Sequence, residues 1–299
     1  MKSSRVITSH IMPDPSRPNG GDSLFYRLEL SESSNPKNDP TIVILHDLYD
    51  YHERYRMIKE LAPDMIQGRV NFLWLDLRGF GLSGGTRHHV DDFDTYTNDI
   101  KKVLDSLQGT IGKNYIFLGV GLGCICFLRF FQSFQDQEDF HIKGMVLINP
   151  IFKFNARQSG LINRLFSPLD AFEKPMKLMR WSVKIDFRLI NSRTKEVEKL
   201  YSDPLITDVL TTGLYEEIMR VALEVRETSY FIDFPLFVIE SSKYNLVAHH
   251  SIDHFLKGVD KKYLSTQVYE HSFYDLLHDL DGEAALSKIF DWFHQNFLK

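Results

Sequence analysis

Four short, continuous apolar runs divide the first half of the chain. They are Thr41–Leu45, Val70–Leu75, Tyr115–Val120 and Met145–Ile148. A run without polar alternation is typical of a strand that is buried on both faces, and such strands belong to parallel sheets. Segments with helical spacing lie between them. We therefore expect an α/β protein with a mostly parallel central sheet flanked by helices.

The same pattern predicts the domain organisation. One strand is expected earlier in the chain, at Ser23–Leu30. Residues 151–221 break the alternation of strand and helix, and we expect them to form an inserted helical cap. Residues 1–150 and 222–299 would then form the core of a single structural domain. The other expected elements are helices at Arg54–Ile66, Asp91–Leu107, Leu122–Phe134, His250–Gly258 and Glu283–Phe297, and strands at Pro235–Glu240 and Thr266–Tyr269.

Composition narrows the class of protein. A chain of 299 residues can bury a large core without disulfides or metals. Its net charge of −5 argues against binding nucleic acid. The only two cysteines, Cys124 and Cys126, do not suggest a disulfide framework. Because the first residues lack an apolar signal segment and Tyr115–Leu128 is too short to span a bilayer, we expect a cytoplasmic protein.

Polar and glycine-rich loops follow the predicted strands. In open parallel sheets, ligands bind at the carboxyl ends of the strands, so these loops are the candidate site. They read HDL at 46–48, DLRGFGLSG at 76–84, GVGLG at 119–123, SSKYN at 241–245 and HSFYDLLH at 271–278.

These loops, in this order, resemble the α/β-hydrolase fold and its monoacylglycerol lipase and lysophospholipase-like branch, the serine aminopeptidase S33 type. The resemblance covers about residues 20–297 and includes Asp203-Pro204-Leu205 near the end of the cap. It implies a hydrolase scaffold with a Ser-His-Asp triad, in which the serine lies in a Gly-x-Ser-x-Gly turn, the nucleophile elbow.

The three triad positions carry other residues here. Gly121 stands at the serine position, Tyr244 at the aspartate position and Asp275 at the histidine position. Glycine supplies no nucleophile, and losing the serine of such a triad costs roughly six powers of ten in rate. Glycine also adopts the strained backbone of this turn easily. We therefore expect a pseudoenzyme that keeps the scaffold and has lost esterase and lipase activity.

The oxyanion loop departs from the branch as well. Asp47 stands where the branch has glycine, and Leu48 and Leu122 are the equivalents of the other oxyanion-loop residues. A carboxylate there would repel a developing oxyanion instead of stabilising it. We expect the site to be more acidic than an esterase pocket, with carboxylates within about 10 Å of Gly121.

Two enzymatic alternatives remain open. The first is a non-serine enzyme of this fold, a lyase or a cofactor-free enzyme, that uses Asp275 and Tyr244 as an acid/base pair. The second is a residual lipase or esterase with a displaced nucleophile, either Cys124, Ser241 or Ser242. For His46 and His278, which the branch also carries, we expect a structural role, with His46 holding its loop through the ring nitrogens.

The cap contains a basic segment, Lys174–Lys195, with seven basic residues and one acid, Asp186. Helical spacing would place four of these basic side chains on one face: Lys177, Arg180, Lys184 and Arg188. This face is either a solvated helix side, a docking surface for an acidic protein partner, or a contact for anionic lipid headgroups. We expect action through a protein partner or a small apolar ligand, and no cofactor, metal or nucleic acid.

Overall fold

The structure is a computed structural model that describes residues 6–11, 23–63, 66, 68–155, 182–243 and 246–298. For residues 182–184 it describes the backbone but not the side chains. Tyr244, Lys177 and Arg180 therefore lie outside the described residues, as does the side chain of Lys184.

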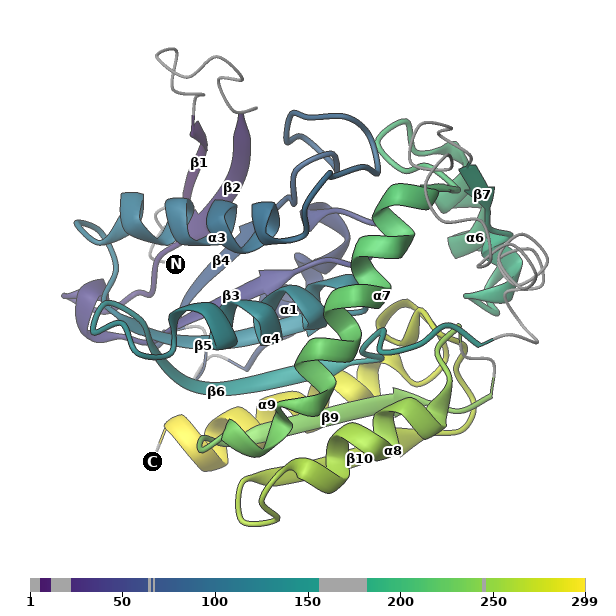
Figure 1. The fold of residues 1–299 in the computed structure, drawn as a ribbon. Helices are drawn as coiled ribbons and strands as arrows, with labels where there is room; N and C mark the ends of the chain where they lie inside the picture. Colours follow the sequence, from purple (N-terminus) through teal and green to yellow (C-terminus); the bar gives the residue numbers. More distant parts are fainter. Residues whose placement is uncertain are drawn as a thin grey trace.

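An eight-stranded sheet forms the centre of the molecule (Figure 1). Its strand order is β1-β2-β4-β3-β5-β6-β9-β10. All neighbours from β4 to β10 run parallel, whereas β1 and β2 are antiparallel additions at one edge. The strands are β1 (Val6–Ile11), β2 (Leu24–Glu29), β3 (Thr41–Leu45), β4 (Asn71–Leu75), β5 (Asn114–Val120), β6 (His141–Ile148), β9 (Leu236–Ser241) and β10 (Leu264–Tyr269). The expected α/β architecture is confirmed.

Helices cover both faces of the sheet, and two apolar clusters fill the space between. In β3, Val43 and Leu45 point into one cluster and Ile42 and Ile44 into the other. This explains why the run at Thr41–Leu45 is apolar without alternation. The first cluster includes α3 (Asp94–Leu107), α4 (Leu122–Phe134), α7 (Thr212–Glu227) and α8 (His249–Gly258); the second includes α1 (Met57–Glu60) and α9 (Gly282–Phe297).

Two elements near the N-terminus differ from expectation. The helix predicted over Arg54–Ile66 is a 3-10 turn, η2 (His52–Tyr55), followed by the single turn α1. Pro63 disfavours helical backbone in the residue before it, and the Ala62 N–H already bonds to the Lys59 carbonyl in a tight turn. Strand β1 was not predicted because most of its side chains are exposed, so no apolar pattern marks it.

The described part of the cap contains a small β-ladder as well as helices. Strand β7 (Ser182–Lys184) pairs antiparallel with β8 (Val209–Thr211), and η4 (Phe187–Leu189) and α6 (Thr194–Ser202) lie between them. The single helical face predicted through Lys184 and Arg188 is therefore wrong over this part. Residues 182–184 pair with β8 and are therefore extended, not helical. The Asp186 carboxylate then begins a new turn by accepting a hydrogen bond from the Arg188 N–H.

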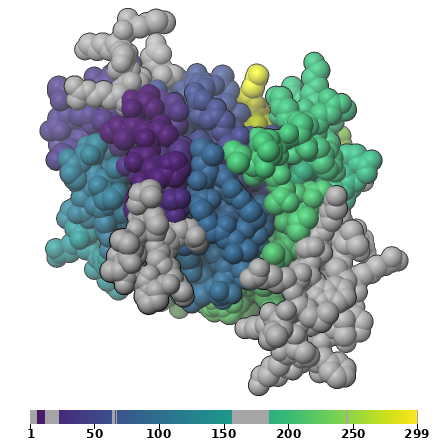
Figure 2. Space-filling model, turned by 90° about the horizontal axis from the view of Figure 1, so that it is seen from above, coloured from purple at the N-terminus to yellow at the C-terminus, as the bar shows by residue number. Residues whose placement is uncertain are grey.

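The cap lies over the loops at the carboxyl ends of the strands. Green residues of the described cap lie against the blue residues of the core (Figure 2), and the Thr211 hydroxyl of β8 donates to the His88 carbonyl, in the loop before α3, at 2.7 Å. Helix α7 continues along α4 on one face of the sheet (Figure 1), and Glu224 pairs with Arg129 of α4. The remaining short turns are η1 (Pro36–Asn38), η5 (Ser229–Phe231) and η6 (Leu276–His278).

Candidate functional site

The sharp turn between β5 and α4 is preserved. Strand β5 ends at Val120, helix α4 begins at Leu122, and Gly121 between them has φ 52° and ψ −107°. This is a backbone conformation that glycine adopts without the strain a side chain would bring. The Gly121 N–H donates to the Ile148 carbonyl at 2.9 Å, so neighbouring β6 helps to hold the turn.

The Asp47 side chain fills the space beside this turn. A Cβ atom placed on Gly121 would overlap the Asp47 carboxyl and the Tyr274 hydroxyl. Asp47 Oδ1 accepts a hydrogen bond from the Leu122 backbone N–H at 2.9 Å, and the residue is buried. The expectation of a carboxylate close to Gly121 is thus confirmed for Asp47, which is in contact with the turn.

Burial changes the acidity of this carboxyl. Desolvation raises the pKa of Asp47 to about 7, although the backbone N–H groups of Leu122 and Leu48 act in the opposite direction. The Tyr274 hydroxyl beside it is buried without a well-aligned hydrogen-bond partner among the described residues. The group next to the turn is therefore a carboxyl that loses its proton only near neutral pH.

Asp275 is held by three partners. It accepts from Arg54 at 2.6 Å and from Asn191 at 2.9 Å, and the ring of His278 lies 2.6 Å away through Nδ1. Burial favours the neutral form of Asp275, but the charges of His278 and Arg54 outweigh burial and lower its pKa to about 2. The carboxylate is thus ionised and fully engaged. It accepts hydrogen bonds at the position predicted to correspond to the triad histidine.

Arg54 is the centre of this charge network. Its Nε lies 2.9 Å from Asp50, and a third carboxylate, Glu196 of α6, lies 3.6 Å from its Nη1. The ligand atoms of Asp50, Asp275 and His278 lie within 4.8 Å of one another, a spacing that would suit a metal ion. The Arg54 guanidinium already supplies the cation for both carboxylates, so these side chains do not need a metal to balance their charge.

The ring nitrogens of His46 and His278 form hydrogen bonds with backbone groups. The Leu77 N–H donates to His46 Nε2 at 3.0 Å, so His46 Nδ1 carries the proton and donates to the Asp47 carbonyl at 2.7 Å. Burial lowers the pKa of His46, which keeps the ring neutral. His278 Nε2 lies 2.9 Å from the Arg54 carbonyl. Both rings therefore connect separate loops.

None of the candidate displaced nucleophiles is activated by the surrounding groups. The Cys124 thiol is buried and donates to the Gly119 carbonyl at 3.1 Å, and burial raises its pKa. The Ser241 hydroxyl is buried and accepts from the Asn149 amide at 3.0 Å. The Ser242 hydroxyl lies 3.4 Å from the Tyr269 carbonyl. A thiol of raised pKa and hydroxyls bonded to amide groups are poor nucleophiles.

The position of the triad aspartate follows strand β9. Tyr244, predicted to replace that aspartate, is outside the described residues. The nearest described carboxylate on this strand is Glu240, which pairs with His249 of α8 at 3.0 Å. The hydrogen bond to Glu240 raises the pKa of His249, and the pair links β9 to α8.

Several polar contacts fasten the described part of the cap to the loop that carries Asp275. Asn191 binds the Asp275 carboxylate, the Asp275 N–H donates to the Ile190 carbonyl at 2.8 Å, and the Ser192 N–H and hydroxyl both bind Asp279. Phe187 of η4 is almost fully buried, and its ring packs against the Tyr49 ring at 5.9 Å. Side chains of the cap and the core therefore meet directly above the loops of the site.

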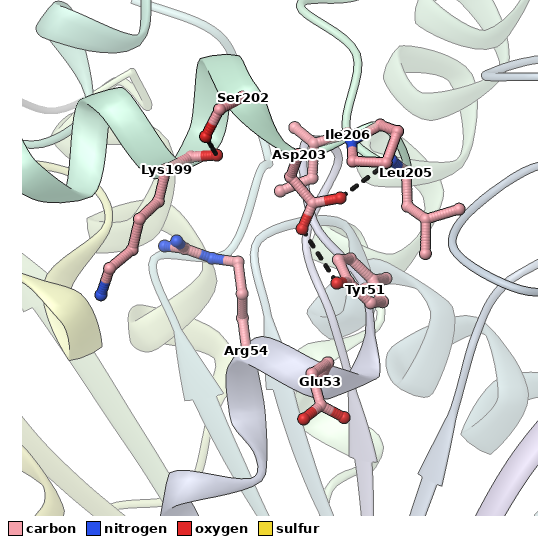
Figure 3. Close-up of a pocket in the computed structure, with 9 residues that line it drawn as sticks. Tyr51, Glu53, Arg54, Lys199, Ser202, Asp203, Leu205 and Ile206 are labelled. Carbon is pink, nitrogen blue, oxygen red and sulfur yellow. Dashed lines mark hydrogen bonds between the residues drawn. The ribbon is translucent and has the colours of Figure 1, made fainter.

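A hollow of about 500 Å³ lies between η2 and the end of α6 (Figure 3). Tyr51 at its base donates to Asp203 at 2.9 Å. Lys199 and Arg54 also line it (Figure 3), and Lys199 pairs with Glu196 at 2.7 Å. Neither Gly121 nor Asp47 lines this hollow, so it is separate from the turn that would carry the nucleophile.

The basic segment is described only in part. Arg188 is exposed and binds the neighbouring Asp186, which neutralises its charge locally. Arg193 and Lys195 are exposed as well. The predicted docking face therefore reduces, in the described part, to these exposed cations. No helix among the described residues has the length and apolar character needed to cross a bilayer.

Sheet order, helix layers and the turn at Gly121 define an α/β-hydrolase of the lipase and esterase type. The chain belongs to the serine aminopeptidase S33 family, whose sequence profile matches residues 36–281. The resemblance inferred from the sequence is confirmed.

Relatives in sequence and structure agree with this assignment. Phospholipase YtpA of Bacillus subtilis is 22% identical over 247 residues, which span 81% of this chain and 90% of the relative. Monoglyceride lipase of Mus musculus is 23% identical over 277 residues, 91% of this chain and 87% of the relative. The monoacylglycerol lipase of Paleococcus ferrophilus superposes with a TM-score of 0.73 at 16% identity, covering 91% of this chain and 99% of that one.

Sequence reasoning missed the partners of Asp275. Arg54 lies in the run 46–55 that carried the family resemblance, but its charge gave no sign that it reaches a loop 221 positions away. Asn191 lies in the cap, where the sequence pattern did not predict which residues face the core. One feature of the sequence did point to Arg54. It follows a loop, residues 46–53, that contains three carboxylates, and such a loop needs a cation nearby when it is buried.

Proposed function

We propose that this lipase-like protein does not hydrolyse esters through a serine nucleophile and acts instead by binding a protein partner. The observation that carries the proposal is the glycine in the nucleophile turn, together with a carboxyl in the space that a serine would occupy. Serine hydrolysis needs a hydroxyl, an imidazole to take its proton and a carboxylate to orient the imidazole.

The residue at the histidine position cannot replace the imidazole. A general base should have a pKa near the working pH, whereas ion pairing lowers the pKa of Asp275 to about 2. The same value argues against an acid/base pair of Asp275 and Tyr244. For this reason we favour a binding role over a lyase or cofactor-free enzyme.

The packing of the cap supports a protein partner over an apolar ligand. Phe187 and Tyr49 fill the space under the described cap, and Asp47 and Tyr274 fill the space at the turn. The exposed cations of the described cap, Arg188, Arg193 and Lys195, then form the surface left for recognition. We propose that the basic segment docks an acidic protein partner. A cytoplasmic location of the protein remains a prediction.

Intact-mass measurement after incubation with a fluorophosphonate tests the absence of serine hydrolysis. A monoacylglycerol lipase treated in the same way serves as the positive control. We expect the lipase to gain the mass of one adduct and this protein to gain none. An adduct on this protein would contradict the proposal, and peptide mapping would then name the hydroxyl.

Charge reversal tests the docking surface. We expect Arg193→Glu with Lys195→Glu to remove salt-sensitive partners from a quantitative affinity purification. Lys257→Glu with Lys261→Glu, on exposed positions of α8 and the loop after it, is the matched control and should keep them. Equal partner recovery from both variants would contradict a docking role for the basic segment.

One observation favours a second candidate, a small ligand under the cap. Tyr49 Oη is a buried polar atom without a hydrogen-bond partner among the described residues. Unpaired buried groups cost about 1–3 kcal/mol each. Solvent extraction of the purified protein followed by mass spectrometry would reveal a stoichiometric organic ligand, and its absence would leave the protein-partner proposal.

A further inference from the structure

The backbone N–H groups of Leu122 and Leu48 occupy informative positions. In α/β-hydrolases the N–H of the residue after the nucleophile, together with an N–H from the loop after an earlier strand, forms the oxyanion hole. Leu122 follows the turn at Gly121, and Leu48 lies in the loop after β3. In a working hydrolase these donors bind the negative oxygen that develops in the transition state.

Both donors act on one side chain of this protein. The Leu122 N–H donates to Asp47 Oδ1 at 2.9 Å. The Leu48 N–H also stabilises the ionised form of this carboxyl. The carboxylate oxygen carries the charge that these donors bind in an oxyanion. Because the side chain is buried at the turn, it excludes any other oxygen from the same donors.

We propose that Asp47 is the built-in occupant of the oxyanion hole, so that the chain closes this site with its own carboxyl. This goes beyond the loss of the triad, because it is a second and independent obstacle to hydrolysis. A serine restored at position 121 would meet the Asp47 carboxyl and would find its oxyanion donors already used. The inference holds whichever partner the protein binds.

Several titratable groups face the carboxyl. Among the described carboxyls, Asp50 raises the pKa of Asp47 through its charge and is itself bound to Arg54. The other titratable groups stay neutral near pH 7, because burial raises the pKa of each phenol and of the thiol and lowers that of the imidazole: Tyr49, Tyr55, Tyr274, Cys124 and His46. Ionisation of Asp47 is therefore the expected source of a local signal near neutral pH.

Nuclear magnetic resonance of leucine amides tests the occupancy. In deuterated protein labelled with ¹⁵N-leucine, the amide signals of Leu48 and Leu122 should titrate with one common midpoint. The Asp47→Asn variant should lose this titration, and the remote Leu107 and Leu298 amides provide a reference in the same spectra. Leu122 and Leu48 signals that do not titrate, or that titrate unchanged in Asp47→Asn, would overturn the proposal.

A double-mutant cycle tests the same contact through stability. Gly121→Ala should lower the unfolding midpoint strongly, because its Cβ meets the Asp47 carboxyl. In an Asp47→Gly background the equilibrium penalty of Gly121→Ala should fall by about tenfold or more. If Gly121→Ala folds only together with Asp47→Gly, the proposal is supported. Gly109→Ala, where a Cβ meets nothing, controls for the substitution itself, and equal penalties in both backgrounds would contradict the contact.

The outcome is separable from the proposed function. The amide titration and the stability cycle measure where the Asp47 carboxyl lies, and neither involves hydrolysis or a partner. A fluorophosphonate adduct would overturn the proposed absence of serine chemistry and leave the occupancy of the oxyanion hole as measured.

Discussion

Asp47 and Asp275 are two buried carboxyls with opposite behaviour. Asp47 has backbone N–H donors but no cation in contact, so burial dominates and raises its pKa to about 7. Asp275 touches Arg54 and His278, whose charges outweigh burial and lower its pKa to about 2. Ionisation of Asp47 therefore destabilises the folded protein at neutral pH, whereas the contribution of Asp275 to stability depends on its cationic partners.

We predict that Asp47→Asn stabilises the protein at alkaline pH. The pKa of Asp47 is 3.8 in the unfolded chain and about 7 when folded, so its cost to stability develops between these values and is complete above pH 7. Removing the charge should recover up to about 4 kcal/mol at pH 8 and almost nothing at pH 4. Thermal melts across this range measure the difference, and a gain that does not grow with pH would contradict the cause.

We predict that Arg54→Met destabilises the protein by about 3–5 kcal/mol at pH 7, because it removes the guanidinium that pairs with both buried carboxylates, Asp50 and Asp275, and leaves them with the His278 ring. The loss of stability should become smaller towards pH 4, because the carboxylates that lack the guanidinium in the variant bind protons there. Urea unfolding at both pH values is the measurement. Arg56→Met, which removes a surface pair with Glu53, is the control and should cost less than about 1 kcal/mol.

At the scale of elements, the segment from η4 to α6 is tied to the core loops by polar side chains. The Asn191 amide nitrogen donates to Asp275 of the loop before η6, and its side-chain oxygen Oδ1 accepts from the Arg193 N–H at 2.8 Å. Ser192 adds a bond to Asp279. Tyr51 holds the other end of α6 through Asp203. The attachment of this segment thus depends on a few hydrogen bonds at the two ends of α6.

We predict that Asn191→Ala loosens this segment without unfolding the core. Hydrogen exchange of peptides covering residues 186–203 should speed up by about tenfold or more, because a bond to a charged group contributes roughly 1.5–3 kcal/mol. Peptides from β3 and β5 should be unchanged. Ser202→Ala on the same helix is the matched control, since its hydroxyl bonds only to the Lys199 carbonyl. Faster exchange everywhere would point to global destabilisation instead.

At the scale of the whole molecule, the site is assembled from loops far apart in the sequence. The loop after β3 brings Asp47, the turn after β5 brings Gly121, and the loop after β10 brings Tyr274 and Asp275. Parallel strands place these loops at one edge of the sheet. A change in one loop therefore alters the space available to residues from the others.

We predict that restoring the triad alone does not restore hydrolysis. The variant Gly121→Ser, Tyr244→Asp, Asp275→His should give no turnover of p-nitrophenyl butyrate above the wild type, because Asp47 still fills the oxyanion hole. Adding Asp47→Gly should give the first measurable turnover. Melting temperatures confirm that both variants fold, and turnover by the triple variant equal to that of the quadruple variant would contradict this view.

The strands and most helices were predictable because their signals are local. Leu122–Phe134 was predicted with the bounds that the structure shows, since an apolar run after a glycine turn marks both ends of the helix. The loops of the site were predictable for the same reason. Strand β7 and turn η4 were not, because Ser182–Lys184 pairs with β8, whose residues lie 25 to 29 positions further along the chain.

By itself, the sequence determined the family and the sheet, and it predicted glycine at the position of the nucleophile, because these depend on residue types at fixed spacings along the chain. Tertiary structure decided which side chains meet beside that glycine. It placed the Asp47 carboxyl against the Leu122 N–H and gave Asp275 the cation Arg54. Such contacts join loops that are distant in sequence, and no local pattern encodes the distance between two side chains that meet only when the sheet has formed.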